Sequence, residues 1–296
     1  MINATFLSTS GVYNSSSARA GIPFTPLLVD DFSAQPDGTI YDIWNNRSVY
    51  ASDQPSASGR SLKLTLLPNT QTNLTASSCG VSSHSYGGRS VLPANVPIGK
   101  SIWVSWKRFI PTNFTYGYCY GGADNAAAVA CSQNGDGNDW LKDLVLAPTN
   151  GTSRIYIQPF MRRRNSAQAL GNRIITEVGP HYNDALSVKY PLGEWFTHQV
   201  QVYVHDTAAG FVREWINGDL VNSVTGGNVT SGNSLREFGI GDYWNGVPYT
   251  DGTASLSQWV KELIIATDMD GYGAPTGVDS GGRTYIDPLT TVASLT

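Results

Sequence analysis

Two stretches of alternating side chains, at residues 193–205 and 211–221, constrain the fold of this chain more than any other feature. In the first stretch the valines stand at every second position, with polar or aromatic residues between them: Gln199, Val200, Gln201, Val202, Tyr203, Val204 and His205. Successive side chains of a strand point to opposite faces, so the pattern predicts an apolar core face and a polar outward face. Asn217 and Gly218 both tolerate positive φ and predict a tight hairpin turn in the second stretch.

Comparable alternation recurs along the chain, and no stretch of useful length shows helical periodicity. The expected strands are residues 27–32, 61–67, 101–110, 140–146, 154–158, 235–244 and 257–267, with 172–178 as a further candidate. Proline and glycine separate many of these stretches, as at Pro68 and Pro111. Many strands joined by turns predict an all-β protein, a two-sheet antiparallel sandwich or jelly roll.

The length of 296 residues suits one large β domain, and 41% hydrophobic residues are enough to build its core. We expect that domain at residues 27–270. Residues 1–26 are rich in Ser, Thr and Asn and end in a proline-containing segment, which predicts an N-terminal arm. Residues 271–296 are rich in Gly, Pro and Ser and are expected to form a C-terminal tail.

Charge and hydropathy exclude several classes of protein. The net charge of -4 argues against a nucleic-acid partner, which would require a basic face. No apolar run is long enough to span a membrane, and residues 1–20 lack the pattern of a signal peptide. The three cysteines lack metal-binding spacing. Cys119 and Cys131 could close one loop, or all three, including Cys79, could remain free thiols.

Four segments together resemble the concanavalin A-like lectin/glucanase jelly rolls, and within them the polysaccharide-lyase branch. They are residues 30–32, 103–111, the hairpin at 193–218, and residues 241–244 with 259–267. The likeness runs from about residue 28 to 270. It implies two bent antiparallel sheets with a concave groove that binds glycans. In lyases of this kind it also implies cleavage of uronic-acid polymers by β-elimination.

Such a reaction needs a donor that neutralises the uronate carboxylate, a base that takes the C5 proton and an acid that protonates the leaving oxygen. Arg154 or Arg162 is the candidate neutraliser, because a guanidinium can grip a carboxylate through two hydrogen bonds. Tyr203 and His205 are the candidate proton-transfer groups. Polar side chains on strands and stacking tryptophans are the candidate glycan-binding residues: Gln199, Gln201, Tyr156, Gln158, Trp103, Lys107 and Trp244.

The chain departs from the better-known catalytic patterns. It lacks a full arginine–glutamine–histidine–tyrosine set at family spacing, and it lacks the paired acidic motif of the related glycoside hydrolases. Asp139 and Asp143 are the nearest carboxylates at strand-compatible spacing for a retaining hydrolase. The resemblance also suggests a structural calcium held by Asp31 and Asp270, where the first and last strands meet. No other cofactor is expected.

Two main hypotheses follow for function. The first is a structural, carbohydrate-binding jelly roll on a particle surface, a bacteriophage capsid decoration or tail protein. It would contact copies of itself, other virion subunits and a polysaccharide or cell-surface glycan. Low charge, polar ends and the missing catalytic set favour it. The alternative is a polysaccharide lyase that cleaves an acidic glycan. A secreted, extracellular lectin-like module is a third possibility, which the absent signal peptide disfavours.

Overall fold

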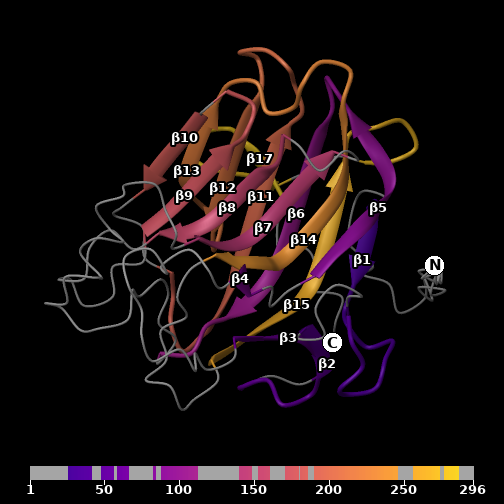
Figure 1. The fold of residues 1–296 in the computed structure, drawn as a ribbon, viewed down its shortest axis with the longest axis vertical. Coiled ribbons are helices and arrows are strands. Elements are labelled where there is room, and N and C mark those ends of the chain that lie inside the picture. The colour runs from indigo at the N-terminus through magenta and orange to yellow at the C-terminus, as the bar shows by residue number, and fades with distance from the viewer. Residues whose placement is uncertain are drawn as a thin grey trace, which may run out of the picture.

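A computed structural model describes most of the chain, in segments. The described residues are 26–41, 48–56, 59–66, 83–84, 88–112, 140–148, 153–160, 171–179, 181–185, 190–245, 256–273 and 277–286. Nearly all of the expected N-terminal arm, Arg162 and all three cysteines lie outside them. The described elements are all strands, in agreement with the all-β prediction (Figure 1). In this part of the chain no helix is long and apolar enough to cross a membrane.

One antiparallel sheet has eight strands in the order β13-β12-β11-β6-β15-β3-β2, with β1 also paired to β15. Its strands are β13 (Asp219–Thr225), β12 (Phe211–Ile216), β11 (Trp195–Tyr203), β6 (Ser101–Phe109), β15 (Leu256–Thr267), β3 (Ser61–Leu66), β2 (Ser48–Ala51) and β1 (Leu28–Asp30). The hairpin predicted from alternation is the pair β12 and β13. Asn217 and Gly218 take positive φ values of 52° and 86° in its turn.

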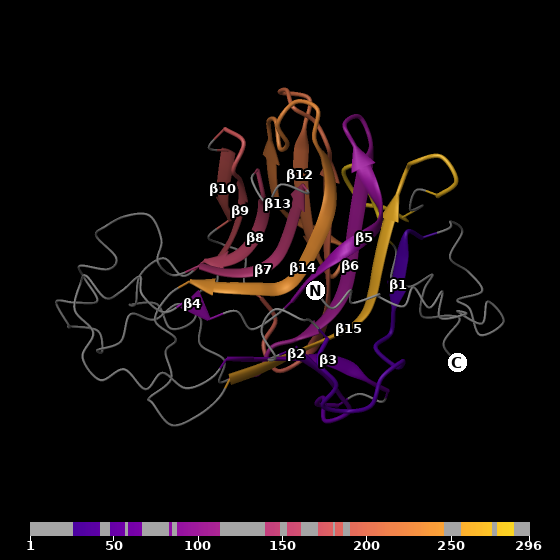
Figure 2. The same ribbon diagram turned by 45° about the vertical axis from the view of Figure 1, so that its right-hand side comes forward.

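A second sheet has seven strands in the order β10-β9-β8-β7-β14-β4, with β5 also paired to β14. Its strands are β10 (His181–Ala185), β9 (Gly171–Thr176), β8 (Ile155–Phe160), β7 (Trp140–Pro148), β14 (Ser234–Asn245), β4 (Ser83–His84) and β5 (Gly88–Pro97). Figure 2 shows the strong bend in β14. Its register with β7 shifts between Ile240 and Tyr243, and Gly241 takes a φ of 62° there. Such a bulge bends a strand locally.

The main core lies between the two sheets. Val200 and Val202 of β11 face it from one side, and Leu144 of β7 and Ile157 of β8 face it from the other. The valine face predicted for β11 is therefore confirmed. His198 shares that face and is fully buried, as the alternation requires. We call the opposite face of each sheet, directed away from this core, its outer face.

A buried ion pair joins the two sheets through this core. The Arg108 guanidinium on β6 donates two parallel hydrogen bonds to the Asp143 carboxylate on β7, at 2.5 and 2.6 Å. Its Nε donates a third bond of 2.7 Å to Gln258 on β15. Both charged side chains are 2% exposed or less. Asp143, which the sequence offered as a hydrolase carboxylate, is thus a structural group inside the sandwich, and Asp139 lies outside the described residues.

A second polar pair lies beside the first. His198 Nε2 is 2.5 Å from Glu214 Oε1 on β12, and both side chains are fully buried. Burial, reinforced by the positive charge of Arg108, lowers the pKa of His198 to about 3, although Asp143 opposes the shift. The imidazole is therefore neutral at physiological pH. Within the described part of the chain, the other oxygen of Glu214 and the Nδ1 atom of His198 are buried without a hydrogen-bond partner.

We predict that Asp143→Ala lowers the free energy of unfolding by about 3–5 kcal/mol, because it leaves the Arg108 charge buried without a counter-ion. Urea unfolding followed by tryptophan fluorescence measures the change. The control is Asp37→Ala, which removes a solvent-exposed partner of Arg60 and should cost about 1 kcal/mol or less. Equal losses in the two variants would show that the inter-sheet pair contributes no more to stability than an exposed ion pair does.

Candidate functional site

The polar face predicted for β11 is covered by residues near the C-terminus. There the chain forms a short hairpin, β16 (Gly277–Val278) and β17 (Thr284–Tyr285), over the outer face of the eight-stranded sheet. Gln199 donates to the Ile286 carbonyl and accepts a 2.8 Å hydrogen bond from the Ile286 N–H. The indole of Trp103 donates to the Thr284 carbonyl at 3.1 Å. Part of the expected C-terminal tail therefore packs on the sheet.

Three of the predicted glycan-binding residues are buried on this covered face. Gln199, Gln201 and Trp103 are only 2–4% exposed. Their alternation with aliphatic residues predicted an open polar face, and that expectation is wrong for these three side chains. The reason is long-range: alternation assigns a side chain to a face but cannot tell which distant segment lies on that face.

The predicted proton-transfer residues lie at the end of β11. The ring of Tyr203 stacks on Phe211 at 5.5 Å between centroids. His205 Nδ1 accepts hydrogen bonds from the backbone N–H of Thr207 at 3.1 Å and from its hydroxyl at 2.9 Å. Arg154 instead precedes β8 in the other sheet, where its partner is Glu177. The three predicted catalytic residues thus belong to two different sheets, and their roles stay predictions.

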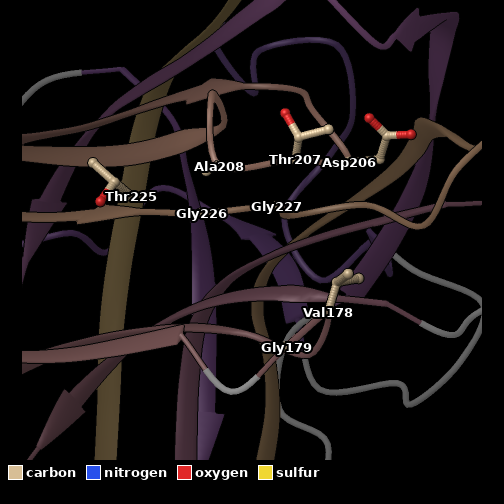
Figure 3. A pocket seen from close by; sticks show the side chains of 8 residues that line it. All are labelled: Val178, Gly179, Asp206, Thr207, Ala208, Thr225, Gly226 and Gly227. Atoms are coloured by element: carbon tan, nitrogen blue, oxygen red, sulfur yellow. The ribbon is translucent and has the colours of Figure 1, made fainter.

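A shallow pocket of about 390 Å³ opens beside Asp206 and Thr207 (Figure 3). It lies between Val178 and Gly179 after β9, residues 206–208 after β11, and residues 225–227 at the end of β13. Asp206 is the charged residue among those that line it. Because a carboxylate repels another carboxylate, this pocket does not suit an acidic sugar.

A different cluster lies on the outer face of the seven-stranded sheet. The Tyr156 hydroxyl donates to Glu177 Oε1, and the Lys142 ammonium lies 4.1 Å from the centroid of the Tyr156 ring. Arg154 holds the other carboxylate oxygen through its backbone N–H at 3.0 Å and its Nε at 3.3 Å. Val145 packs beside Tyr156 on this face. Adjacent strands β7, β8 and the end of β9 thus bring together two cations, a phenol and a carboxylate.

The side chains of this cluster differ in how far they are exposed to solvent. Tyr156 and Lys142 are 1% and 4% exposed, whereas the side chains of Arg154 and Glu177 are about one-third exposed. Burial alone would raise the pKa of Glu177. The hydrogen bonds from Tyr156 and the Arg154 backbone, together with the Arg154 charge, outweigh burial and lower that pKa. Glu177 is therefore an ionised acceptor at neutral pH.

Tyr156 and Arg154 of this cluster were predicted from the sequence, whereas Lys142 and Glu177 were not. Alternation on β9 could have found Glu177, because Ile174 faces the core and Glu177 falls on the opposite face. Lys142 gives no such signal, since the pattern changes at the bulge opposite Asp143. Gln158 pairs in register with Arg173 of β9, two positions beyond Tyr156.

The remaining predicted site residues lie elsewhere. Lys107 is on the outer face of the eight-stranded sheet, 2.9 Å from Glu262. The side chains of Gln158 and Trp244 are outside the described part of the structure. Asp31 accepts a hydrogen bond from the Ser33 N–H, and Asp270 is exposed, 3.8 Å from Lys100. No group of three or more metal-binding side chains gathers among the described residues, and the calcium site stays a prediction.

Comparison with known proteins gives a likeness in structure alone. No protein-family profile and no curated sequence matches the chain. An alginate lyase solved with an alginate trisaccharide is 10% identical and aligns over 81% of this chain and 98% of its own, with a TM-score of 0.51. The fold is that of the concanavalin A-like jelly rolls.

Two further similar structures are also polysaccharide lyases. The endo-β-1,4-glucuronan lyase of the fungus Trichoderma reesei is 14% identical, with 81% of this chain and 95% of its own covered and a TM-score of 0.46. An alginate lyase of Aplysia kurodai is 13% identical, with 82% and 99% covered and a TM-score of 0.46. The two antiparallel sheets and the likeness at a TM-score of 0.51 confirm the jelly-roll sandwich predicted from sequence.

The C-terminal cover yields a prediction about pH. Asp279 accepts the indole N–H of Trp215 at 3.0 Å and the backbone N–H groups of Gly281 and Arg283. Burial alone would raise the pKa of Asp279, but these bonds and the Arg283 charge outweigh it and lower the pKa. Because folding favours the ionised form, the Asp279 carboxylate stabilises the fold at pH values above its unfolded-state pKa of about 3.9. That stabilisation is lost as the pH falls through the lower folded-state pKa.

Asp279→Asn should therefore destabilise the protein at pH 7 and have a much smaller effect near pH 3. Urea titrations of wild type and variant at the two pH values measure the difference, in which other titrating groups cancel. A destabilisation that is the same at both pH values would show that the charge of Asp279 does not contribute.

Proposed function

We propose that this chain is a polysaccharide lyase for an acidic, uronic-acid glycan, and that the cluster on the outer face of the seven-stranded sheet is its active site. The observation that carries the proposal is the convergence of Lys142, Arg154, Tyr156 and Glu177 on one sheet face. The lyases named above, one of them holding an alginate trisaccharide, support the reaction class. They favour it over the particle-surface role, which has no comparable support.

The cluster offers a group for each requirement of β-elimination. Arg154 uses Nε for Glu177, so its two terminal nitrogens are the donors that face the uronate carboxylate. Neutralising that carboxylate makes the C5 proton easier to remove. Glu177 is the positioning residue, since one carboxylate oxygen holds Arg154 and the other holds Tyr156.

Tyr156 is the proposed proton-transfer group. The Lys142 ammonium lies 4.1 Å from the centroid of its ring. The base takes the C5 proton, the C5–H electron pair forms the C4–C5 double bond, and the C4–O bond breaks. The leaving oxygen then receives a proton. A related alginate lyase holds an alginate tetrasaccharide in a variant with alanine in place of one lysine and one tyrosine.

The first test is ultraviolet absorbance during incubation with alginate, glucuronan, pectate and a heparin-like polymer. Elimination creates a double bond conjugated with the carboxylate, so absorbance should rise with at least one substrate. A flat trace with all four would reject the lyase proposal.

The second test separates the two candidate locations. Tyr156→Phe keeps the ring that packs on Val145 but removes the hydroxyl, and should lower kcat by at least about 100-fold, the usual contribution of a proton-transfer group. Tyr203→Phe is the matched control, since it makes the same change on the other sheet, and should retain activity. The reverse result would restore the predicted Tyr203 and His205 as the catalytic pair.

A further inference from the structure

A row of aromatic and basic residues crosses the outer face of the eight-stranded sheet, away from the C-terminal cover. In register, Lys63 of β3 pairs with Trp259 of β15, Trp259 with Phe109 of β6, and Phe109 with Trp195 of β11. Three strand spacings give the row a length of about 14 Å. It lies six residues along β6 from Trp103, or about 20 Å, so it is separate from the covered part of this face.

The three aromatic rings form one continuous wall. The centroid of Phe109 lies 5.6 Å from that of Trp195 and 6.0 Å from that of Trp259. Both indole N–H groups are held from the same side of the row: Trp195 donates to the Pro55 carbonyl at 2.8 Å and Trp259 to Asp53 at 3.0 Å. These bonds fix the orientation of the rings, which is the rigidity that stacking on a sugar ring requires.

Lysines lie on this wall. The Lys63 ammonium is 5.4 Å from the Trp259 ring centroid, and the Lys261 ammonium is 4.7 Å from that of Trp195. Lys261 pairs in register with Lys107, which adds a third ammonium. Asp53 and Glu262 are the carboxylates that contact them, so three positive charges face two negative ones.

Lys261 is the least satisfied of the three. Its side chain is 15% exposed, and its contact with Glu262 Oε1 is long, at 3.7 Å. Burial lowers its pKa, the attraction of Glu262 opposes the shift, and Lys107 adds to it. A partly desolvated ammonium beside a like charge gains from an incoming carboxylate.

We infer that this row is a second, non-catalytic binding surface for an acidic polysaccharide, in which Lys261 and Lys107 take the uronate carboxylates and Trp195 takes a sugar ring. The surplus positive charge selects uronates over neutral glycans. The partly exposed ring of Trp195 provides the apolar contact, and the buried rings of Phe109 and Trp259 support it from below. The surface lies on the opposite side of the sandwich from the Tyr156 cluster, so its binding does not depend on cleavage.

The test is calorimetric titration with sized alginate oligosaccharides in the Tyr156→Phe background, in which the ligand is not consumed. Lys107→Gln with Lys261→Gln should raise the Kd of this surface by at least 10-fold, and Trp195→Ala should do the same. The matched control is Lys100→Gln with Arg236→Gln, which removes two positive charges elsewhere and should leave binding unchanged. Thermal melting verifies that each variant is folded.

Stoichiometry separates this inference from the lyase proposal. If both hold, the row variants reduce two binding sites to one; if only the row binds, they reduce one to none. Binding equal to that of the control, or equal affinity of the intact protein for a dextran of the same length, overturns the inference. So does a wild-type dimer that the row variants dissociate in sedimentation, because the row would then be an interface between copies.

Discussion

The inter-sheet bond between Arg108 and Asp143 fixes the placement of both candidate surfaces. Each partner sits in a strand, and the neighbouring residue points the other way. Lys107 therefore reaches the outer face of the eight-stranded sheet, and Lys142 reaches that of the seven-stranded sheet. A one-residue slip would exchange the core and surface residues of a whole strand. The strand register that allows this bidentate bond is therefore the register that places Lys107 and Lys142 on the two outer faces.

Burying such a pair has a cost that the fold must offset. Taking two charges out of water is expensive, and a well-packed apolar pair of similar volume is often as stable. We hypothesise that Arg108 and Asp143 contribute register more than stability. Three donors of one guanidinium are satisfied by Asp143 and Gln258, so a sheet shifted by one position would leave buried charges unpaired. Replacing both residues by apolar ones and mapping the register by amide exchange would test this hypothesis.

Local sequence pattern predicted the strands but not what covers them. The valines of β11 and the turn at Asn217 and Gly218 follow from rules that act over a few residues, and the structure confirms them. The cover over Gln199 depends on Ile286, 87 positions away, and no periodicity carries that information. The same limit hid Lys142, because one lysine in a strand gives no sign of the tyrosine on the neighbouring strand.

A sandwich with uronate-binding surfaces on both sides would hold a polymer differently from one with a single surface. In the proposed active site the reactive phenol is almost fully buried. Electrostatic interactions are stronger in such surroundings, but the buried group offers little area for binding a polymer. The row at Trp195 and Lys261 offers charged and apolar contacts without a reactive group. A polymer held on the row raises the local concentration of its other segments at the Tyr156 cluster, provided that the chain is long enough to pass around the sandwich. The benefit would therefore grow with polymer length and vanish for short oligosaccharides, which touch one face at a time.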